Sequence, residues 1–135
     1  MYIYNKIYNL FSGILKYFRL YLYQIYFVFM GYVYLLKDIN NDTYKIGVTR
    51  KMDGKRLIAL QTGNSTKLEL IMTYKAEYPF RLESMLHRKF EQYRENNEWF
   101  GLPNDIVECF HYYCQQMNDI IISLKDNPYF NKNLK

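Results

Sequence analysis

The sequence predicts an α+β fold: a small three-stranded antiparallel sheet flanked by helices, with a C-terminal helix. Two observations support this prediction. First, the β-rich runs 32–37 and 43–49 are joined by residues 38–42, a segment dense in turn-forming Asp and Asn, which predicts a β-hairpin. Second, apolar residues recur at helical spacing in two later segments. A chain of 135 residues has the size of one domain with one core.

The elements after the hairpin follow from local patterns. Lys55–Gln61 is expected to form a short helix that ends near Gly63 and Asn64. Lys67–Ala76 alternates apolar and polar residues, which predicts a third strand with one buried face.

Two longer helices are expected in the second half. One begins at Pro79, a residue suited to the first helical position, and runs to about Arg94. Its apolar stripe consists of Leu82, Met85, Leu86, Phe90 and Tyr93. A last helix opens at residues 103–105 and ends at Asn127-Pro128. Because no linker separates these segments, residues 30–102 are interpreted as the main domain and residues 103–135 as a helix packing on it.

Residues 1–29 differ in composition from the rest of the chain. They are rich in Tyr, Phe, Ile and Leu, and they contain three basic residues and no acid. A membrane span is disfavoured because the uncharged run 20–36 holds Gln24 and five tyrosines and overlaps the first strand. The favoured interpretation makes Met30 the natural start, with residues 1–29 as translated upstream sequence. An amphipathic interfacial helix and an authentic packing extension are the alternatives. We expect a soluble, intracellular protein.

The charge distribution is uneven. Residues 45–67 contain six bases and one acid, whereas residues 77–108 contain four bases and seven acids. A basic segment beside an acidic one suits a metal-dependent nuclease, and it also suits an ordinary uneven surface. Cys109 and Cys114 flank His111, but a zinc site needs four ligands, so we expect both cysteines to pack in a helix as reduced thiols.

Five short motifs follow one another between residues 31 and 102. They are Tyr32-Val33-Tyr34 with Tyr44-Lys45-Ile46-Gly47, Arg56, Gln61-Thr62-Gly63-Asn64, Glu83 with His87, and Glu98-Trp99-Phe100. This order resembles the GIY-YIG endonuclease superfamily, most closely a small branch of phages and large DNA viruses whose second signature reads Tyr-Lys-Ile-Gly. The resemblance implies a Mg²⁺-dependent DNA endonuclease (another divalent cation would serve) with no small-molecule cofactor. It leaves the oligomeric state open.

The resemblance also assigns roles to four residues. Tyr34 would help to deprotonate the attacking water, and Arg56 would contact the scissile phosphate. Glu83 would hold the metal ion, as the single carboxylate at that position. Lys45, which stands where most of the family has a tyrosine, would act on Tyr34 or bind phosphate. This requires both side chains on one face, which we expect if the hairpin pairs residue 34 with residue 45.

Several alternatives remain open at these positions. Tyr34 is also a plausible core tyrosine, Arg56 a surface residue, and Glu83 a partner of His87 one helical turn later. The residues expected to contact DNA are Lys45, Arg50, Lys51, Lys55, Arg56, Asn64 and His87. Trp99-Phe100 is interpreted as a packing anchor rather than a base-stacking platform.

The chain departs from the broad family at three positions: Tyr32 replaces a glycine, Lys45 a tyrosine and Leu60 a histidine. The alternative function is a catalytically inactive module of this fold that binds DNA or a protein. A membrane-associated small protein built around residues 1–30 is a third possibility.

Overall fold

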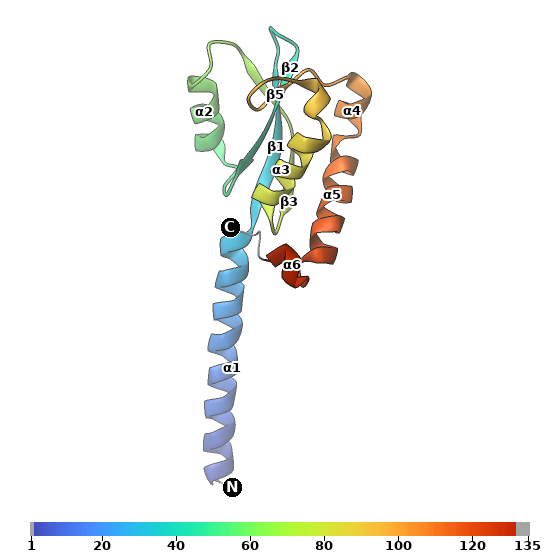
Figure 1. The fold of residues 1–135 in the computed structure, drawn as a ribbon. Coiled ribbons are helices and arrows are strands. Elements are labelled where there is room, and N and C mark those ends of the chain that lie inside the picture. Colours follow the sequence, from blue (N-terminus) through green and yellow to red (C-terminus); the bar gives the residue numbers. More distant parts are fainter. Residues whose placement is uncertain (1, 132–135) are drawn as a thin grey trace. The chain divides into compact units, whose positions relative to one another are not determined.

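The structure, a computed structural model, describes residues 2–131 and divides the chain into two compact units, Met1–Met30 and Gly31–Lys135 (Figure 1). The first unit is a single long helix, α1 (Tyr2–Phe29). The second contains β1 (Gly31–Asp38), β2 (Thr43–Thr49), α2 (Gly54–Thr62), β3 (Leu68–Ala76), α3 (Pro79–Lys89), η1 (Glu91–Tyr93), β4 (Arg94–Asn96), β5 (Trp99–Phe100), α4 (Asn104–Glu108), α5 (Phe110–Leu124) and α6 (Pro128–Asn131).

The sheet of the second unit has five antiparallel strands in the order β3-β1-β2-β5-β4. The α+β class is confirmed, but the predicted count of three strands is wrong. The two additional strands have only three and two residues, so they lack the alternation that identifies longer strands. Asn97, in the turn between them, adopts a φ of 48°, a left-handed conformation that asparagine tolerates.

The predicted helices are mostly confirmed, with two changes at their ends. α3 ends at Lys89 instead of continuing to Arg94, because the chain enters the turn η1 and then β4. The expected last helix is divided at Cys109, where the backbone leaves α-helical geometry with φ −96° and ψ 10°. Cys109 is exposed at this break, so its expected packing is wrong, whereas Cys114 is buried.

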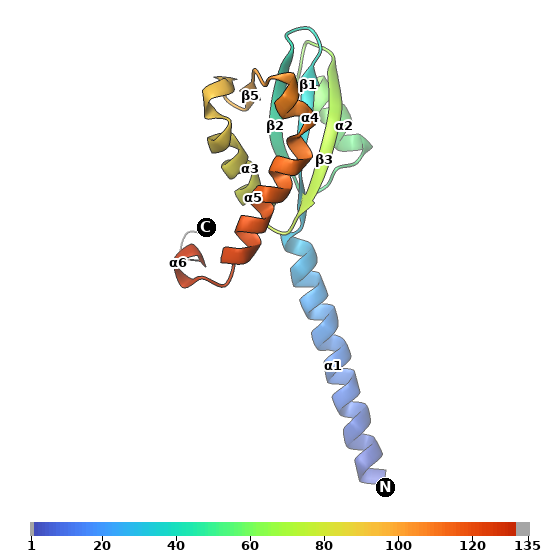
Figure 2. The same cartoon turned by 90° about the vertical axis from the view of Figure 1, so that its right-hand side faces the viewer.

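Helices cover both faces of the sheet (Figures 1 and 2). α3 and α5 pack on the face that carries Val33, Leu35 and Ile46, and this side forms the main hydrophobic core. α2 lies on the other face, which carries Tyr34. Both Tyr34 and Leu35 are almost completely buried, so the central strand β1 is covered on both sides.

Candidate functional site

The site is built around a close contact between β1 and β2. Tyr34 pairs with Gly47 across the two strands. A Cβ atom at position 47 would lie 2.6 Å from Cε2 of Tyr34 and closer still to Cζ and the hydroxyl oxygen. Cross-strand neighbours on one face normally have Cβ atoms about 4.5–5.5 Å apart, so only glycine leaves room for this ring. Gly47 thus allows the Tyr34 ring to lie flat across β2.

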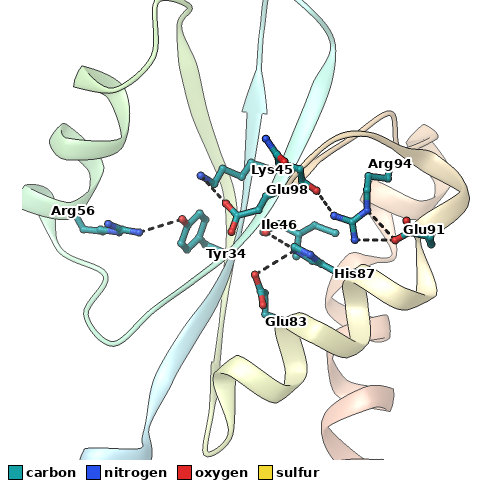
Figure 3. A network of polar contacts seen from close by, with 10 residues as sticks. Tyr34, Lys45, Ile46, Arg56, Glu83, His87, Glu91, Arg94 and Glu98 are labelled. Atoms are coloured by element: carbon teal, nitrogen blue, oxygen red, sulfur yellow. Dashed lines mark hydrogen bonds and ion pairs between the residues drawn. The ribbon is translucent and has the colours of Figure 1, made fainter. Parts of the chain in front are cut away.

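Arg56 approaches Tyr34 from α2. Its Nη2 donates to the Tyr34 hydroxyl oxygen at 3.4 Å (Figure 3). The position of Arg56 follows from the start of the helix, where the Asp53 side chain accepts a hydrogen bond from the Arg56 backbone N–H at 2.9 Å. The Arg56 Nε is buried and has no hydrogen-bond partner among the described residues. A buried donor of this kind is normally paired, so this one is available to an acceptor supplied from outside the chain.

Lys45 lies on the expected face but with a different register and partner. The hairpin pairs Tyr34 with Gly47 and Leu36 with Lys45, so the expected pairing of residues 34 and 45 is wrong by two positions. A shift of two keeps both side chains on the same face, because side chains alternate with a period of two. The Nζ of Lys45 is 2.9 Å from Oε2 of Glu98, a residue that the sequence did not single out as its partner (Figure 3).

Glu83 and His87 face each other on α3. Oε1 of Glu83 is 3.4 Å from Nε2 of His87, and both side chains are 14% exposed. The same Nε2 lies 2.8 Å from the carbonyl oxygen of Ile46. Because a carbonyl only accepts hydrogen bonds, Nε2 must carry the proton. The contact between Glu83 and His87 that the sequence offered as an alternative is thus present in the structure.

Strand β2 connects the two halves of the site. The Ile46 carbonyl accepts a hydrogen bond from Nε2 of His87, and the next residue, Gly47, lies against the Tyr34 ring. A shift of β2 would therefore move the surroundings of Glu83 and of Tyr34 together. The sequence identified the residues on both sides but not this backbone link, which depends on a contact between residues 41 positions apart.

Burial changes the pKa of the Glu83 carboxyl. Its pKa is raised above the usual value, chiefly because the carboxylate is partly removed from water, and the charge of Glu98 acts in the same direction. His87, Arg94 and Lys45 oppose the rise without cancelling it. The described residues contain no group of three or more His, Cys, Asp or Glu side chains placed to hold a metal ion. Any cation here would have to be bound by few protein oxygens.

The other predicted DNA contacts occupy varied settings. Lys51 and Lys55 are exposed beside the start of α2. The Arg50 guanidinium lies 5.5 Å from the centre of the Phe80 ring. The Asn64 side chain donates to the Leu60 carbonyl at 2.8 Å, so it caps the end of α2.

The remaining residues singled out in the sequence serve packing. Phe100 is fully buried, with its ring centroid 5.1 Å from that of His87, as expected of a packing anchor, whereas Trp99 is only partly buried. Burial raises the pKa of the Cys114 thiol to about 12, so this cysteine is a neutral core residue. The His111 ring meets Tyr74 edge to face, with centroids 5.3 Å apart.

Residues 31–112 match the family model of the T5orf172 domain, a domain found in phage proteins. No curated protein and no solved structure matches the chain. The matched segment begins at the first residue of β1, extends into α5 and includes every residue of the site described above. Since it covers more than half of the sequence, the chain belongs to the T5orf172 domain family.

Proposed function

We propose that this protein is a Mg²⁺-dependent DNA endonuclease that hydrolyses phosphodiester bonds by a GIY-YIG-type mechanism. The observation that carries the proposal is the contact between the Tyr34 hydroxyl and the Arg56 guanidinium, together with the unpartnered, buried Nε of Arg56. The family gives independent support, because the T5orf172 domain is associated with homing-endonuclease-like proteins.

Arg56 and Tyr34 have complementary tasks in this proposal. A guanidinium presents five donors in a planar fork and binds phosphate oxygens through two of them at once. Nε, which has no partner among the described residues, would donate to the phosphate and satisfy its buried N–H. The Tyr34 oxygen is held in place by the Arg56 donor. Once its own phenolic proton has passed to solvent, it would accept a proton from the water molecule that attacks the phosphorus.

The surroundings of Glu83 fit a Mg²⁺ ion. This ion usually keeps several waters and takes only one or two protein carboxylates together with substrate phosphate oxygens, so a three-ligand cluster is not needed. Burial of the Glu83 carboxylate raises its pKa above the usual value, and a bound cation would stabilise the charged form. Bound there, Mg²⁺ would stabilise the charge that develops on the phosphate. His87 would keep the carboxylate oriented.

The test is a plasmid-nicking assay with the full chain, in Mg²⁺ and in EDTA. We expect nicking only with Mg²⁺, and we expect Glu83→Gln to abolish it while low-salt DNA binding remains near that of the parent. Loss of the metal site removes several kcal/mol of transition-state stabilisation, on the order of a thousandfold or more in rate. Glu108→Gln, the same change at an exposed site on α4, is the matched control and should nick normally. Parental nicking by Glu83→Gln would refute the metal assignment.

A stability measurement separates loss of function from loss of fold. The raised pKa of Glu83 means that the folded state holds its proton more tightly than the unfolded state. The stability of the parent therefore falls as pH rises above the ordinary value of 4.5. Glutamine does not titrate, so in EDTA Glu83→Gln should be at least as stable as the parent at pH 7. A large loss of stability would show that the Glu83–His87 contact is structural.

The second candidate is a catalytically inactive DNA-binding or protein-interaction module. It is favoured by the ion pair of Lys45 with Glu98 and the contact of Glu83 with His87, because both contacts form within the chain. This function predicts DNA or protein binding with no Mg²⁺-dependent nicking by the parent chain.

A further inference from the structure

Between residues 5 and 19, the helix α1 separates its apolar and polar side chains onto two faces, and Leu20, which is 51% exposed on the polar side, ends this separation. The apolar face includes Ile7, Leu10, Phe11, Ile14, Leu15 and Phe18. At 100° per residue these side chains share one arc of about 140°. Asn5, Asn9, Ser12, Lys16 and Arg19 lie on the opposite side of the helix. This pattern is that of an amphipathic helix with one continuous apolar surface.

The apolar face of α1 is open to solvent. Leu10 is 67% exposed, Phe11 63% and Phe18 56%, and the other three side chains named on this face are exposed to a similar degree. Single exposed apolar residues are common on protein surfaces, but contiguous apolar patches mark interaction sites. This face has the composition of a surface that is covered by a partner.

The charges of this unit indicate the chemistry of that partner. Residues 1–30 contain Lys6, Lys16 and Arg19 and no acidic residue. Lys16 and Arg19 project from the face opposite Phe11 and Phe18, and their long side chains can reach around the helix toward anionic groups. Tyr17, at the border of the two faces, is 75% exposed and has the apolar ring and polar tip typical of a residue at a membrane–water boundary. A partner with an apolar interior and an anionic surface matches this arrangement.

A second copy of the helix matches less well. Paired helices bury a narrow seam and place charges of both signs beside it, whereas here the apolar arc is wider and every charge is positive. A transmembrane orientation is also disfavoured, because no helix among the described residues is long and apolar enough to cross a bilayer. An orientation in the plane of the lipid surface satisfies both observations.

We propose that α1 binds the surface of an anionic lipid bilayer, with its apolar face in the acyl–headgroup boundary and its basic residues on the lipid phosphates. The sequence alone favoured upstream translation for residues 1–29 and held an interfacial helix as an alternative. The exposed apolar face of a continuous helix now favours that alternative. The proposal does not depend on the nuclease function.

The test is flotation of the full chain with phosphatidylcholine vesicles, with and without phosphatidylglycerol, whose anionic headgroups give the vesicle a negative surface. We expect flotation with the anionic vesicles, and a decrease in high salt. Phe11→Gln with Phe18→Gln should lower partitioning about a hundredfold, because burying each ring contributes about 1.5 kcal/mol or more and 1.4 kcal/mol is a factor of ten. The matched control, Asn9→Gln with Ser12→Gln, changes two residues of the polar face and should float like the parent.

The outcomes discriminate between the possible occupants. Flotation that requires Phe11 and Phe18 and decreases on Lys16→Gln with Arg19→Gln supports the proposal. Absence of flotation with anionic vesicles overturns it, and so does flotation that is insensitive to the two phenylalanines. If the chain does not float but forms oligomers by light scattering, and Phe11→Gln with Phe18→Gln dissociates them, the apolar face is instead an interface between copies of the chain.

Discussion

Replacing Gly47 with alanine adds one methyl group at the centre of the candidate site. No glycine of the described chain has a positive φ, so alanine fits the backbone of β2 without conformational strain. The new Cβ would nevertheless lie 2.6 Å from Cε2 of Tyr34, whereas non-bonded carbon atoms prefer about 3.5–4.0 Å. The ring must therefore move by about 1 Å. It is almost completely buried, so no open space is available to receive it.

Two opposing effects set the size of the change in stability. Overpacking a well-packed region costs about 1–3 kcal/mol. Alanine also restricts the unfolded chain relative to glycine, which contributes about 0.5–1 kcal/mol in favour of folding. We expect a net loss of about 1–2 kcal/mol, or a decrease in Tm of about 4 °C or more for a unit of this size. Because a misplacement of about 1 Å lowers rates by about a hundredfold, nicking should decrease by more than the loss of stability explains.

A double-mutant cycle measured by urea denaturation isolates the steric cause. Once Tyr34 is replaced with alanine, the ring is absent, and adding Gly47→Ala should be neutral or slightly stabilising. Gly101→Ala is the matched control, because its Cβ would meet the flexible end of Glu95 at 2.7 Å, which can rotate away. If Gly47→Ala costs the same with and without the Tyr34 ring, the ring is not what the glycine accommodates, and the coupling of β1 and β2 inferred here is incorrect.

Two further predictions concern single carboxylates. Glu98→Gln should free Lys45 for phosphate, so low-salt DNA affinity should increase and the slope of log K against log salt should steepen by up to about one. Glu108→Gln makes the same change in net charge at an exposed site, and an equal gain there would contradict the specific release of Lys45. Asp38 accepts hydrogen bonds from Asn41 and from the Asn40 backbone, and these lower the pKa of its carboxyl below the usual 3.8. Asp38→Asn should therefore reduce Tm at pH 7, and the difference from the parent should shrink as the pH falls below 3.8, because the parent then loses the same contribution. Asp42→Asn, at an exposed carboxylate of the same hairpin, should change Tm little across this range.

The sequence predicted the elements whose pattern is local. β2 has the predicted bounds, and the predicted helix near Arg56 is present as α2, because turn formers and caps act within a few residues. The half-buried alternation of β3 is likewise confirmed. The hairpin β4–β5 was missed because strands of three and two residues are too short to show a period. The Asn96-Asn97 dipeptide was the available signal, since asparagine is common in tight turns.

The arrangement of the candidate site was harder to predict than the fold, because it depends on contacts between residues far apart in the sequence. Arg56 and Tyr34 were selected from the sequence, and the structure brings their side chains into contact. The partner of Lys45 was missed, because Glu98 lies 53 positions away and reaches Lys45 only through the pairing of β2 with β5. The role of Gly47 could have been inferred from the residues only with the correct register, and that register is set by the geometry of the turn after Asp38.

The strand β5 contains only two residues, and this short length affects how long Lys45 stays paired with Glu98. Its position depends on the buried Phe100 side chain and a few backbone bonds, among them the Ile46 N–H to the Glu98 carbonyl at 3.1 Å. Segments held by so few backbone contacts open far more often than the whole domain unfolds. Each opening separates Glu98 from Lys45, so the positive charge offered to a ligand is a time average over closed and open states. A ligand that binds Lys45 only in the open state would increase the population of that state. The pairing of β5 with β2 would then control reversibly how much of the Lys45 charge is available to the ligand.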